Sequence, residues 1–367
     1  MMDLYEYWLA GLIPIAGRKK IQLKRLFPEL EELYGLKEPA IAALPCLTGL
    51  EKQKLKEGQK KTKQKLQEET GICSEQGIWL ALWQRPGYPG RLKDIYNPPY
   101  GLFVKGSLPD PARLAVAVVG ARGCSLYGKT VAERIGASLA QAGAEVLSGL
   151  AAGIDGAGHR GALRAGGRTF GVLGCGIDVC YPAENRELYG AVPRQGGLVS
   201  EYPPKTRPYA MLFPQRNRLI SGLADVVVVV EAKERSGALI TADFALEQGK
   251  EVYAVPGRIG DVMSKGANRL IRQGAGIVLS PEDLLEELDL LRAGRSPFGS
   301  QKKINLEISD CLVYSCLGFT PKSLDELMEE TGISLAGLLD CLDILQGQGR
   351  VSEVYKNYFV QAEGFGG

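Results

Sequence analysis

The sequence DVVVVVEAKERSG, residues 225–237, decides the fold. Its five consecutive valines, Val226–Val230, are typical of a strand that is buried on both faces in the middle of a parallel sheet. A polar loop follows them, and a helix is expected to begin at Ser236 and Gly237. Such a strand–loop–helix unit predicts an α/β sheet that is covered by helices on both faces.

Similar units lie on both sides of the valine run. Short apolar, β-rich runs alternate with helical stretches between residues 78 and 290. These runs are Leu114–Val119, Ala144–Leu147, Thr169–Leu173, Leu198–Ser200, Val252–Val255 and Gly276–Leu279. The alternation predicts an open, doubly wound, mostly parallel sheet of the Rossmann-like kind. Ligands of such sheets bind beyond the carboxyl ends of the strands.

The chain is expected to divide into three domains and one linker. Residues 1–75 show helical periodicity, residues 76–291 hold the sheet, and residues 292–303, rich in Gly, Ser, Pro and basic residues, read as a linker. Residues 304–367 combine two helices, joined by a turn at Gly332, with strand character at 351–360. This is the layout of a winged-helix domain.

Composition excludes several classes of protein. The formal net charge is only +2, so charge summed over the chain neither favours nor excludes a nucleic acid. The eight cysteines form no CxxC pair and His159 is the single histidine, so we expect no metal site and free thiols in a reducing cytosol. Neither a signal peptide nor an apolar run of about 18 residues is present, so a cytoplasmic protein without a membrane span is expected.

The first turn after a predicted strand runs from Gly120 to Ser125 and opens a helix. Its backbone N–H groups are expected to face an anion, and Arg122 adds a guanidinium suited to phosphate. The turn is not GxGxxG, and the second strand ends at Ser148-Gly149 without a carboxylate for a ribose hydroxyl. Both facts argue against a nicotinamide cofactor, and we expect no cofactor. One such turn alone can also be a plain tight connection.

Two more stretches carry residues suited to an anion. Gly149 and Gly153 let the backbone approach a ligand closely, and Asp155 can cap a helix. In FPQRNRLISGL, residues 213–223, two arginines flank Asn217. A buried arginine needs a partner. Arg216 and Arg218 therefore either form ion pairs within the chain, with Glu201, Asp225 or Glu231, or meet phosphate.

These loops all follow strand ends and should converge on one face of the sheet. Ser236-Gly237 opens another helix, and Lys265, Asn268 and Arg269 follow the next strand. Several anion-ready turns on one face predict a row of phosphates, and hence a polynucleotide backbone.

Taken in order, the motifs resemble the DNA-processing protein A (DprA/Smf) family. They include SGLAAGID at 148–155, SEYPP at 200–204, FPQRNRLISGL at 213–223 and EAKERSGALITA at 231–242. The resemblance implies an extended Rossmann fold with an N-terminal helical SAM-like domain and a C-terminal winged-helix (DML1-like) domain. It implies a non-enzymatic homodimer that binds single-stranded DNA and loads RecA onto incoming strands during natural transformation, in competent cells. Single-strand-binding protein is a further candidate partner.

The family's DNA pocket carries over residue by residue. Three further residues, Gly120, Lys265 and Asn268, are suggested by the turns themselves. The full set of expected phosphate contacts is Gly120, Arg122, Ser125, Gly149, Gly153, Asp155, Arg216, Asn217, Arg218, Ser236, Gly237, Lys265 and Asn268. Phe213 is the candidate for base stacking. Ala121 stands where a serine or threonine is common, and Ala152 where some members carry a basic residue, so we expect weaker affinity but not lost binding.

One enzymatic alternative is a Rossmann-type nucleotide-processing protein similar to phosphoribohydrolases, with Glu201 or Glu231 as catalytic acid. Those enzymes carry a PGGxGTxxE loop where this chain has ERSGALITAD, which lacks a glutamate at the matching spacing.

A second expectation concerns the predicted helix 334–346, which carries Asp340 and Asp343 but no Lys or Arg. We expect it not to read duplex DNA and to serve a protein contact or a structural role.

Overall fold

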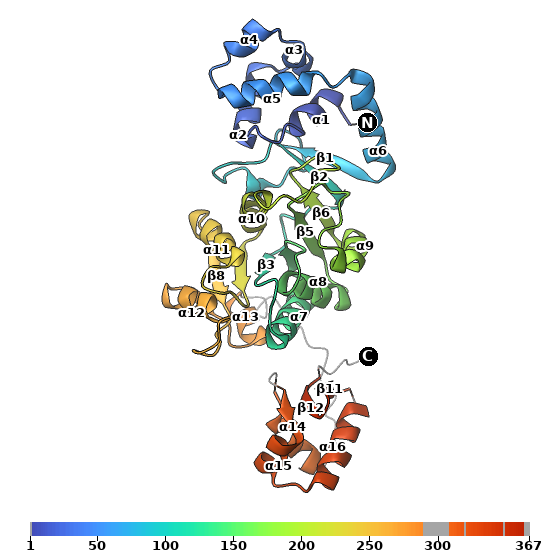
Figure 1. The fold of residues 1–367 in the computed structure, drawn as a ribbon, viewed down its shortest axis with the longest axis vertical. Helices are drawn as coiled ribbons and strands as arrows, with labels where there is room; N and C mark the ends of the chain where they lie inside the picture. Colours follow the sequence, from blue (N-terminus) through green and yellow to red (C-terminus); the bar gives the residue numbers. More distant parts are fainter. Residues whose placement is uncertain (1, 289–307, 319–320, 348, 363–367) are drawn as a thin grey trace. The chain divides into compact units, whose positions relative to one another are not determined.

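The computed structural model describes residues 2–288, 308–318, 321–347 and 349–362 (Figure 1). The chain forms two compact units, one within residues 1–297 and the other within 298–367. The predicted linker, 292–303, lies outside the described residues.

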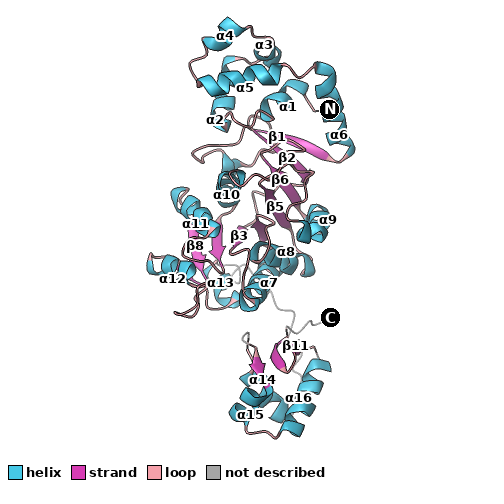
Figure 2. Ribbon diagram, in the orientation of Figure 1, coloured by secondary structure: helices cyan, strands magenta, loops and turns pink. Residues whose placement is uncertain are grey.

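The larger unit contains a nine-stranded sheet with helices on both faces (Figure 2). The strand order is β1-β2-β6-β5-β4-β3-β7-β8-β9. The strands are β1 (Ile78–Leu82), β2 (Gly101–Gly106), β3 (Ala115–Val119), β4 (Glu145–Ser148), β5 (Thr169–Leu173), β6 (Gly197–Ser200), β7 (Val226–Val229), β8 (Glu251–Ala254) and β9 (Gly276–Ile277). Strands β3 to β9 are parallel, whereas β2 is antiparallel to both β1 and β6. The predicted Rossmann-like sheet is confirmed, and β1 and β2 extend it at one edge.

Strand β7 is buried on both faces, as its valines predict. Val227 and Val229 belong to the core under one face of the sheet, whereas Val226, Val228 and Val230 belong to the core under the other. The helices of this part are α7 (Leu126–Gln141), α8 (Ile154–Arg164), η2 (Ala183–Asn185, a 3₁₀ turn), α9 (Arg186–Gln195), α10 (Leu212–Leu223), α11 (Gly237–Glu247), α12 (Lys265–Arg272) and α13 (Pro281–Glu287). The first core contains residues of α10, α11 and α12, and the second contains residues of α7, α8 and α13.

Six helices precede the sheet. They are α1 (Leu4–Ala10), α2 (Gly17–Leu26), α3 (Leu30–Tyr34), α4 (Glu38–Ala42), α5 (Gly49–Gln59) and α6 (Lys63–Glu75), and the 3₁₀ turn η1 (Gly90–Leu92) follows β1. A capping box of Thr48 and Glu51 starts α5. Leu9, Leu23 and Leu55 share one core with Phe103 of β2 and Leu198 of β6. The helical segment therefore packs directly on the β2–β6 side of the sheet.

The smaller unit has its own core and a three-stranded sheet of order β10-β12-β11. Its elements are α14 (Ile308–Cys316), β10 (Lys322–Ser323), α15 (Leu324–Thr331), α16 (Leu335–Gly347), β11 (Val351–Tyr355) and β12 (Tyr358–Gln361). Ser323 caps α15 in a capping box with Glu326, and Gly332 ends that helix with φ +69°. We keep the winged-helix domain as a prediction.

None of the helices in the described ranges combines the length and the apolar character that a membrane crossing needs.

His159 is buried in α8 and takes part in the packing of the sheet. Its Nδ1 lies 2.6 Å from Thr169 Oγ1, and the side chain is fully buried. Burial, helped by the positive charges of Arg160 and Arg216, lowers the pKa of His159 to about 3. The imidazole is therefore neutral in the folded protein at neutral pH.

We expect His159 to make the protein acid-sensitive. Between pH 6.5 and about 3 the unfolded chain binds a proton on this side chain and the folded chain does not, so the free energy of unfolding falls as pH falls. The expected contribution is up to about 1.4 kcal/mol per pH unit. Urea titrations of the wild type and of His159→Gln measure it as the difference between the two pH slopes. Equal slopes, or an imidazole NMR signal that titrates near pH 6.5 in the folded protein, would contradict the assignment.

Candidate nucleic-acid interface

The candidate site lies where the strand order of the sheet reverses. Strand β3 pairs with β4 on one side and with β7 on the other, so the connections after β3 and β7 leave in opposite directions. Such a switch point opens a crevice beyond the carboxyl ends of the strands. Because β3 to β8 are parallel, the turns that follow them meet at this same edge.

A carboxylate of the chain itself occupies the anion site of the first turn. Glu231, which follows β7, accepts the Ser125 backbone N–H at 2.8 Å, and the Ser125 hydroxyl donates to its other oxygen. Ser125 also caps α7 by accepting the Gly128 N–H at 3.0 Å. A negative charge is stabilised at a helix N-terminus, and Glu231 is buried there. The turn that we expected to receive a phosphate is therefore satisfied internally.

Three predicted phosphate-binding glycines serve close packing of the turns. A Cβ on Gly120 would lie 2.6 Å from Ile154 Cγ1, and one on Gly153 would lie 2.3 Å from the Ala121 carbonyl oxygen. Gly153 also has φ +75°, which only glycine adopts easily. A Cβ on Gly149 would lie 2.5 Å from Arg216 Nη2. These contacts bring the turns after β3 and β4 against each other and against α10.

Arg216 is buried within these turns, with only 4% of its surface exposed. Its Nη1 donates to the Gly149 carbonyl oxygen at 2.9 Å and to the carbonyl oxygen of Val172 in β5, and its Nε donates to Asn217 Oδ1. The carboxylate of Asp155 accepts the Gly149 N–H at 3.0 Å. Burial raises the pKa of Asp155, and the nearby charge of Arg216 opposes that rise.

Arg218 and Asn217 also have partners within the chain. Arg218 forms an ion pair with Glu201, which follows β6, and its Nη1 is buried without a hydrogen-bond partner. The Asn217 amide donates to the Gly237 carbonyl oxygen at 3.2 Å. Of the two possibilities left open for the arginines, ion pairing within the chain describes Arg218, while Arg216 bonds mainly to backbone carbonyl oxygens. Their contact with phosphate stays a prediction.

Exposed groups lie on the outer side of these turns. The Arg122 guanidinium stacks over the Phe213 ring, with Cζ 4.9 Å from the ring centroid. The Tyr181 ring lies 5.5 Å from that of Phe213 at an interplanar angle of 30°. Arg122 is exposed, Phe213 is half-buried and Tyr181 is 39% exposed. A cation and two aromatic rings therefore form one row, which we call the aromatic row.

The start of α11 remains open. Ser236 caps this helix, and nothing lies within 4 Å of a Cβ built on Gly237. Lys233 and Arg235, which sequence reasoning did not select, are exposed just before it. Lys265 is exposed at the start of α12, whereas the side chain of Asn268 accepts the Gly257 N–H at 3.0 Å and donates to the Gly257 carbonyl oxygen at 2.9 Å.

The predicted site residues thus fall into two groups. Arg122, Gly237 and Lys265 are exposed, and Phe213 and Ser236 are half-buried. The others are engaged inside the turns: Gly120, Ser125, Gly149, Gly153, Asp155, Arg216, Asn217, Arg218 and Asn268. Within the described residues, no group of three or more His, Cys, Asp or Glu side chains is arranged to hold a metal ion.

Sequence reasoning missed Tyr181 and the internal role of Glu231. The Tyr181-Pro182 pair after β5 was visible as a motif, but nothing in the sequence placed its ring beside Phe213. Glu231 follows the valine strand directly, and its position opposite the first turn could have been inferred from a β3–β7 pairing.

The sequence is similar to a known protein family and to several of its members. Residues 79–289 match the family model described as DNA recombination-mediator protein A. The chain is 45% identical over 215 residues to the DNA processing protein DprA of Bacillus subtilis, a match that covers 58% of this chain and 72% of that protein.

Two solved structures are also similar. DNA processing protein A from Streptococcus pneumoniae superposes with a TM-score of 0.63 at 33% identity, covering 78% of this chain and 99% of that one. DNA processing protein A from Helicobacter pylori superposes with a TM-score of 0.52 at 27% identity, covering 58% and 96%. The latter structure is described as showing a unique single-stranded DNA binding mode.

We expect the buried and exposed arginines to respond differently to substitution. Arg216→Met removes a buried charge and leaves Asp155 and the carbonyl oxygens of Gly149 and Val172 without their partner, so it should destabilise the fold by about 3–5 kcal/mol. The matched control Arg122→Met, at an exposed position, should change the free energy of unfolding by less than about 0.5 kcal/mol. Urea unfolding followed by circular dichroism measures both. Similar effects of the two substitutions would show that Arg216 does not brace the turns.

Proposed function

The chain belongs to the DNA recombination-mediator protein A family, and from this we propose that it binds single-stranded DNA and passes it to a recombinase. The observation that carries the proposal is the aromatic row of Arg122, Phe213 and Tyr181 at the switch point. Aromatic rings stack on unpaired bases of any sequence, and an arginine among them adds charge for the backbone.

We propose a division of work between the two groups of site residues. The residues engaged inside the turns, together with Glu231, hold the turns in place, and the other group contacts the strand. In this proposal phosphates meet Arg122, the open start of α11 at Ser236 and Gly237, and Lys265. The single-stranded DNA binding described for the H. pylori protein supports the same ligand class here.

The contacts of the two candidate catalytic acids favour a binding protein over an enzyme. Glu231 is bonded to the Ser125 backbone and hydroxyl, and Glu201 is paired with Arg218. A general acid needs a proton to give to a substrate, whereas both carboxylates are held by donors of the chain. The phosphoribohydrolase-like alternative would need one of them released from its partner.

The recombinase is proposed to be RecA, loaded onto incoming strands during natural transformation in the cytoplasm. A homodimer and contact with single-strand-binding protein complete this proposal, and their support is family membership.

The smaller unit adds one observation: Leu335, Leu339 and Ile344 of α16 are exposed. With Asp340 and Asp343 on the same helix, these side chains suit a protein surface better than duplex DNA.

Binding should depend on Phe213 through stacking and on Arg122 through charge. Phe213→Leu keeps an apolar side chain but removes the ring, and should cost about 1–3 kcal/mol, or about 5- to 150-fold in affinity for oligo-dT. Arg122→Ala should reduce the slope of log K against log salt by about 0.7. Fluorescence anisotropy measures both effects.

Arg194→Ala is the control for these variants, because Arg194 is exposed at the opposite edge of the sheet, just before β6. Its affinity for oligo-dT should equal that of the wild type. If Arg122→Ala and Phe213→Leu also bind like the wild type, the aromatic row is not the DNA site.

If the protein loads RecA, strand exchange should become faster on DNA that is covered by single-strand-binding protein. The protein should stimulate strand exchange by the cognate RecA on single strands covered by single-strand-binding protein, and the Phe213→Leu variant should stimulate it less. A strand-exchange assay measures the rate. No stimulation by the wild type above the background of RecA alone would remove the loading role and leave DNA binding intact.

A further inference from the structure

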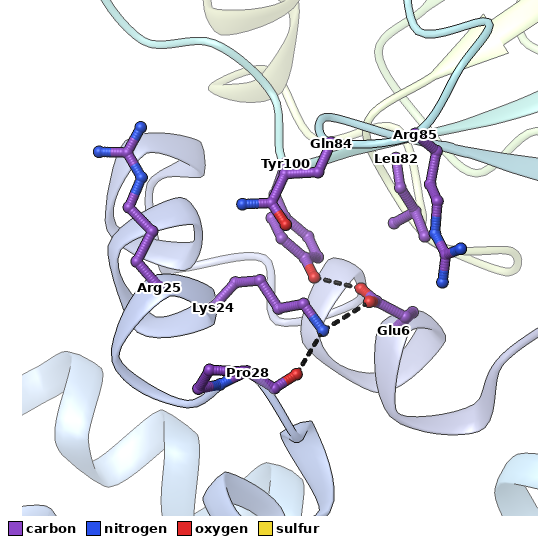
Figure 3. Close-up of a pocket in the computed structure, with 8 residues that line it drawn as sticks. All are labelled: Glu6, Lys24, Arg25, Pro28, Leu82, Gln84, Arg85 and Tyr100. Carbon is purple, nitrogen blue, oxygen red and sulfur yellow. Dashed lines mark hydrogen bonds and ion pairs between the residues drawn. The ribbon is translucent and has the colours of Figure 1, made fainter.

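A pocket of about 480 Å³ lies at the junction of the helical segment and the sheet (Figure 3). Its walls come from α1, from α2 and Pro28 just beyond it, and from the region around the end of β1 and the start of β2. Two arginines line it, Arg25 of α2 and Arg85 after β1, and both are exposed. Neither belongs to the site described above.

The charges in this pocket do not cancel. Of the residues that the structure describes, Glu6 is the only carboxylate that lines it, and Glu6 is already paired with Lys24 at 3.0 Å and accepts the Tyr100 hydroxyl. Lys24 Nζ also donates to the Pro28 carbonyl oxygen at 2.8 Å. Figure 3 shows these three contacts together.

The positive charges of Arg25 and Arg85, one on each side chain, are therefore not balanced by Glu6. Arg25 lies over the Trp83 ring, with Cζ 5.2 Å from the centroid, which places its guanidinium without neutralising it. Among the described residues no carboxylate forms an ion pair with either arginine. A pocket with a net charge of +2 that is supplied by two arginines fits a phosphate group.

Strand direction places this pocket on the edge that carries the aromatic row. Because β2 is antiparallel to both β1 and β6, β1 runs in the same direction as β6. The carboxyl end of β1, at Leu82, therefore lies at the same edge as the carboxyl ends of β3 to β7. The turn after α1 confirms the proximity, since a Cβ on Gly11 would lie 3.7 Å from Cβ of Pro203 in the loop after β6.

The spacing of strands gives the length of the path. Tyr181 follows β5, which is three strands from β1 in the sheet order, and Arg122 follows β3, which is five strands away. At about 4.8 Å per strand, these steps amount to about 14 and 24 Å. A stacked single strand advances about 3.4 Å per nucleotide, so about seven stacked nucleotides span the longer path.

We propose that this pocket binds a backbone phosphate of the same single strand that crosses the aromatic row, and so extends the DNA track from the sheet onto the helical segment. The inference rests on the proposed function. Arg25 and Arg85 hold the phosphate, and the contact is independent of base sequence because a backbone phosphate carries no sequence information.

The test compares two double variants on dT20. Arg25→Gln with Arg85→Gln removes both pocket charges, and Arg113→Gln with Arg194→Gln removes two exposed charges at the opposite edge of the sheet. We expect the pocket variant to bind more weakly, with the slope of log K against log salt reduced by about 0.7, the value for one lost phosphate contact on a single strand. The control should match the wild type. Thermal midpoints of all three proteins verify folding.

Oligo-dT of increasing length tests the role of the pocket separately from the proposed function. The wild type should gain affinity as oligo-dT grows from 5 to 15 nucleotides, and the pocket variant should lose a large part of that gain. If the wild type binds dT20 and the pocket variant binds it like the control, the pocket is not part of the track while the aromatic row stands. If the wild type does not bind dT20, the proposed function fails and this inference fails with it.

Discussion

The buried guanidinium of Arg216 is the interaction on which the strand-end edge depends. It bonds to carbonyl oxygens in the turn after β4 and in β5, lies against Gly149 beside Asp155, and is oriented by Asn217. A buried charge of this kind is tolerated only when its hydrogen bonds and counter-charge are in place. Since Arg216 sits in the first half of α10, the position of that helix is fixed with it, and Phe213 precedes it by one turn of the same helix.

Glu231 stabilises the turn after β3, as Arg216 stabilises the turn after β4. Its carboxylate occupies the start of α7, where other Rossmann-like sheets receive a phosphate. With the internal positions satisfied by the chain, a polyanion meets the outer side of the turns. There the structure offers the aromatic row, the open start of α11 and, at the far end of the same edge, the pocket of Arg25 and Arg85. The edge therefore suits a strand that lies across the sheet better than a mononucleotide held within it.

Sequence reasoning recovered the sheet but not the burial of its loops. The valine run and the alternating apolar runs predicted all seven parallel strands, because a two-sided core demands continuous apolar sequence. Strands β1 and β2 were not picked out, and their antiparallel pairing depends on contacts with β6 and the helical segment. Motif likeness pointed to turns that the structure brings together at one edge of the sheet. It could not say which glycines and arginines face inward, since that depends on which neighbouring turn each one meets in three dimensions.

Binding of single-stranded and duplex DNA over a range of salt concentrations tests the central claim most directly. Titrations of dT20 and of a 20-base-pair duplex give log K against log salt for each ligand. The account predicts that the single strand binds more tightly at every salt concentration and keeps measurable affinity at high salt, because stacking on Phe213 and Tyr181 is not screened. Equal or tighter binding of the duplex, with affinity for both ligands lost at high salt, would show a purely electrostatic surface and contradict the account.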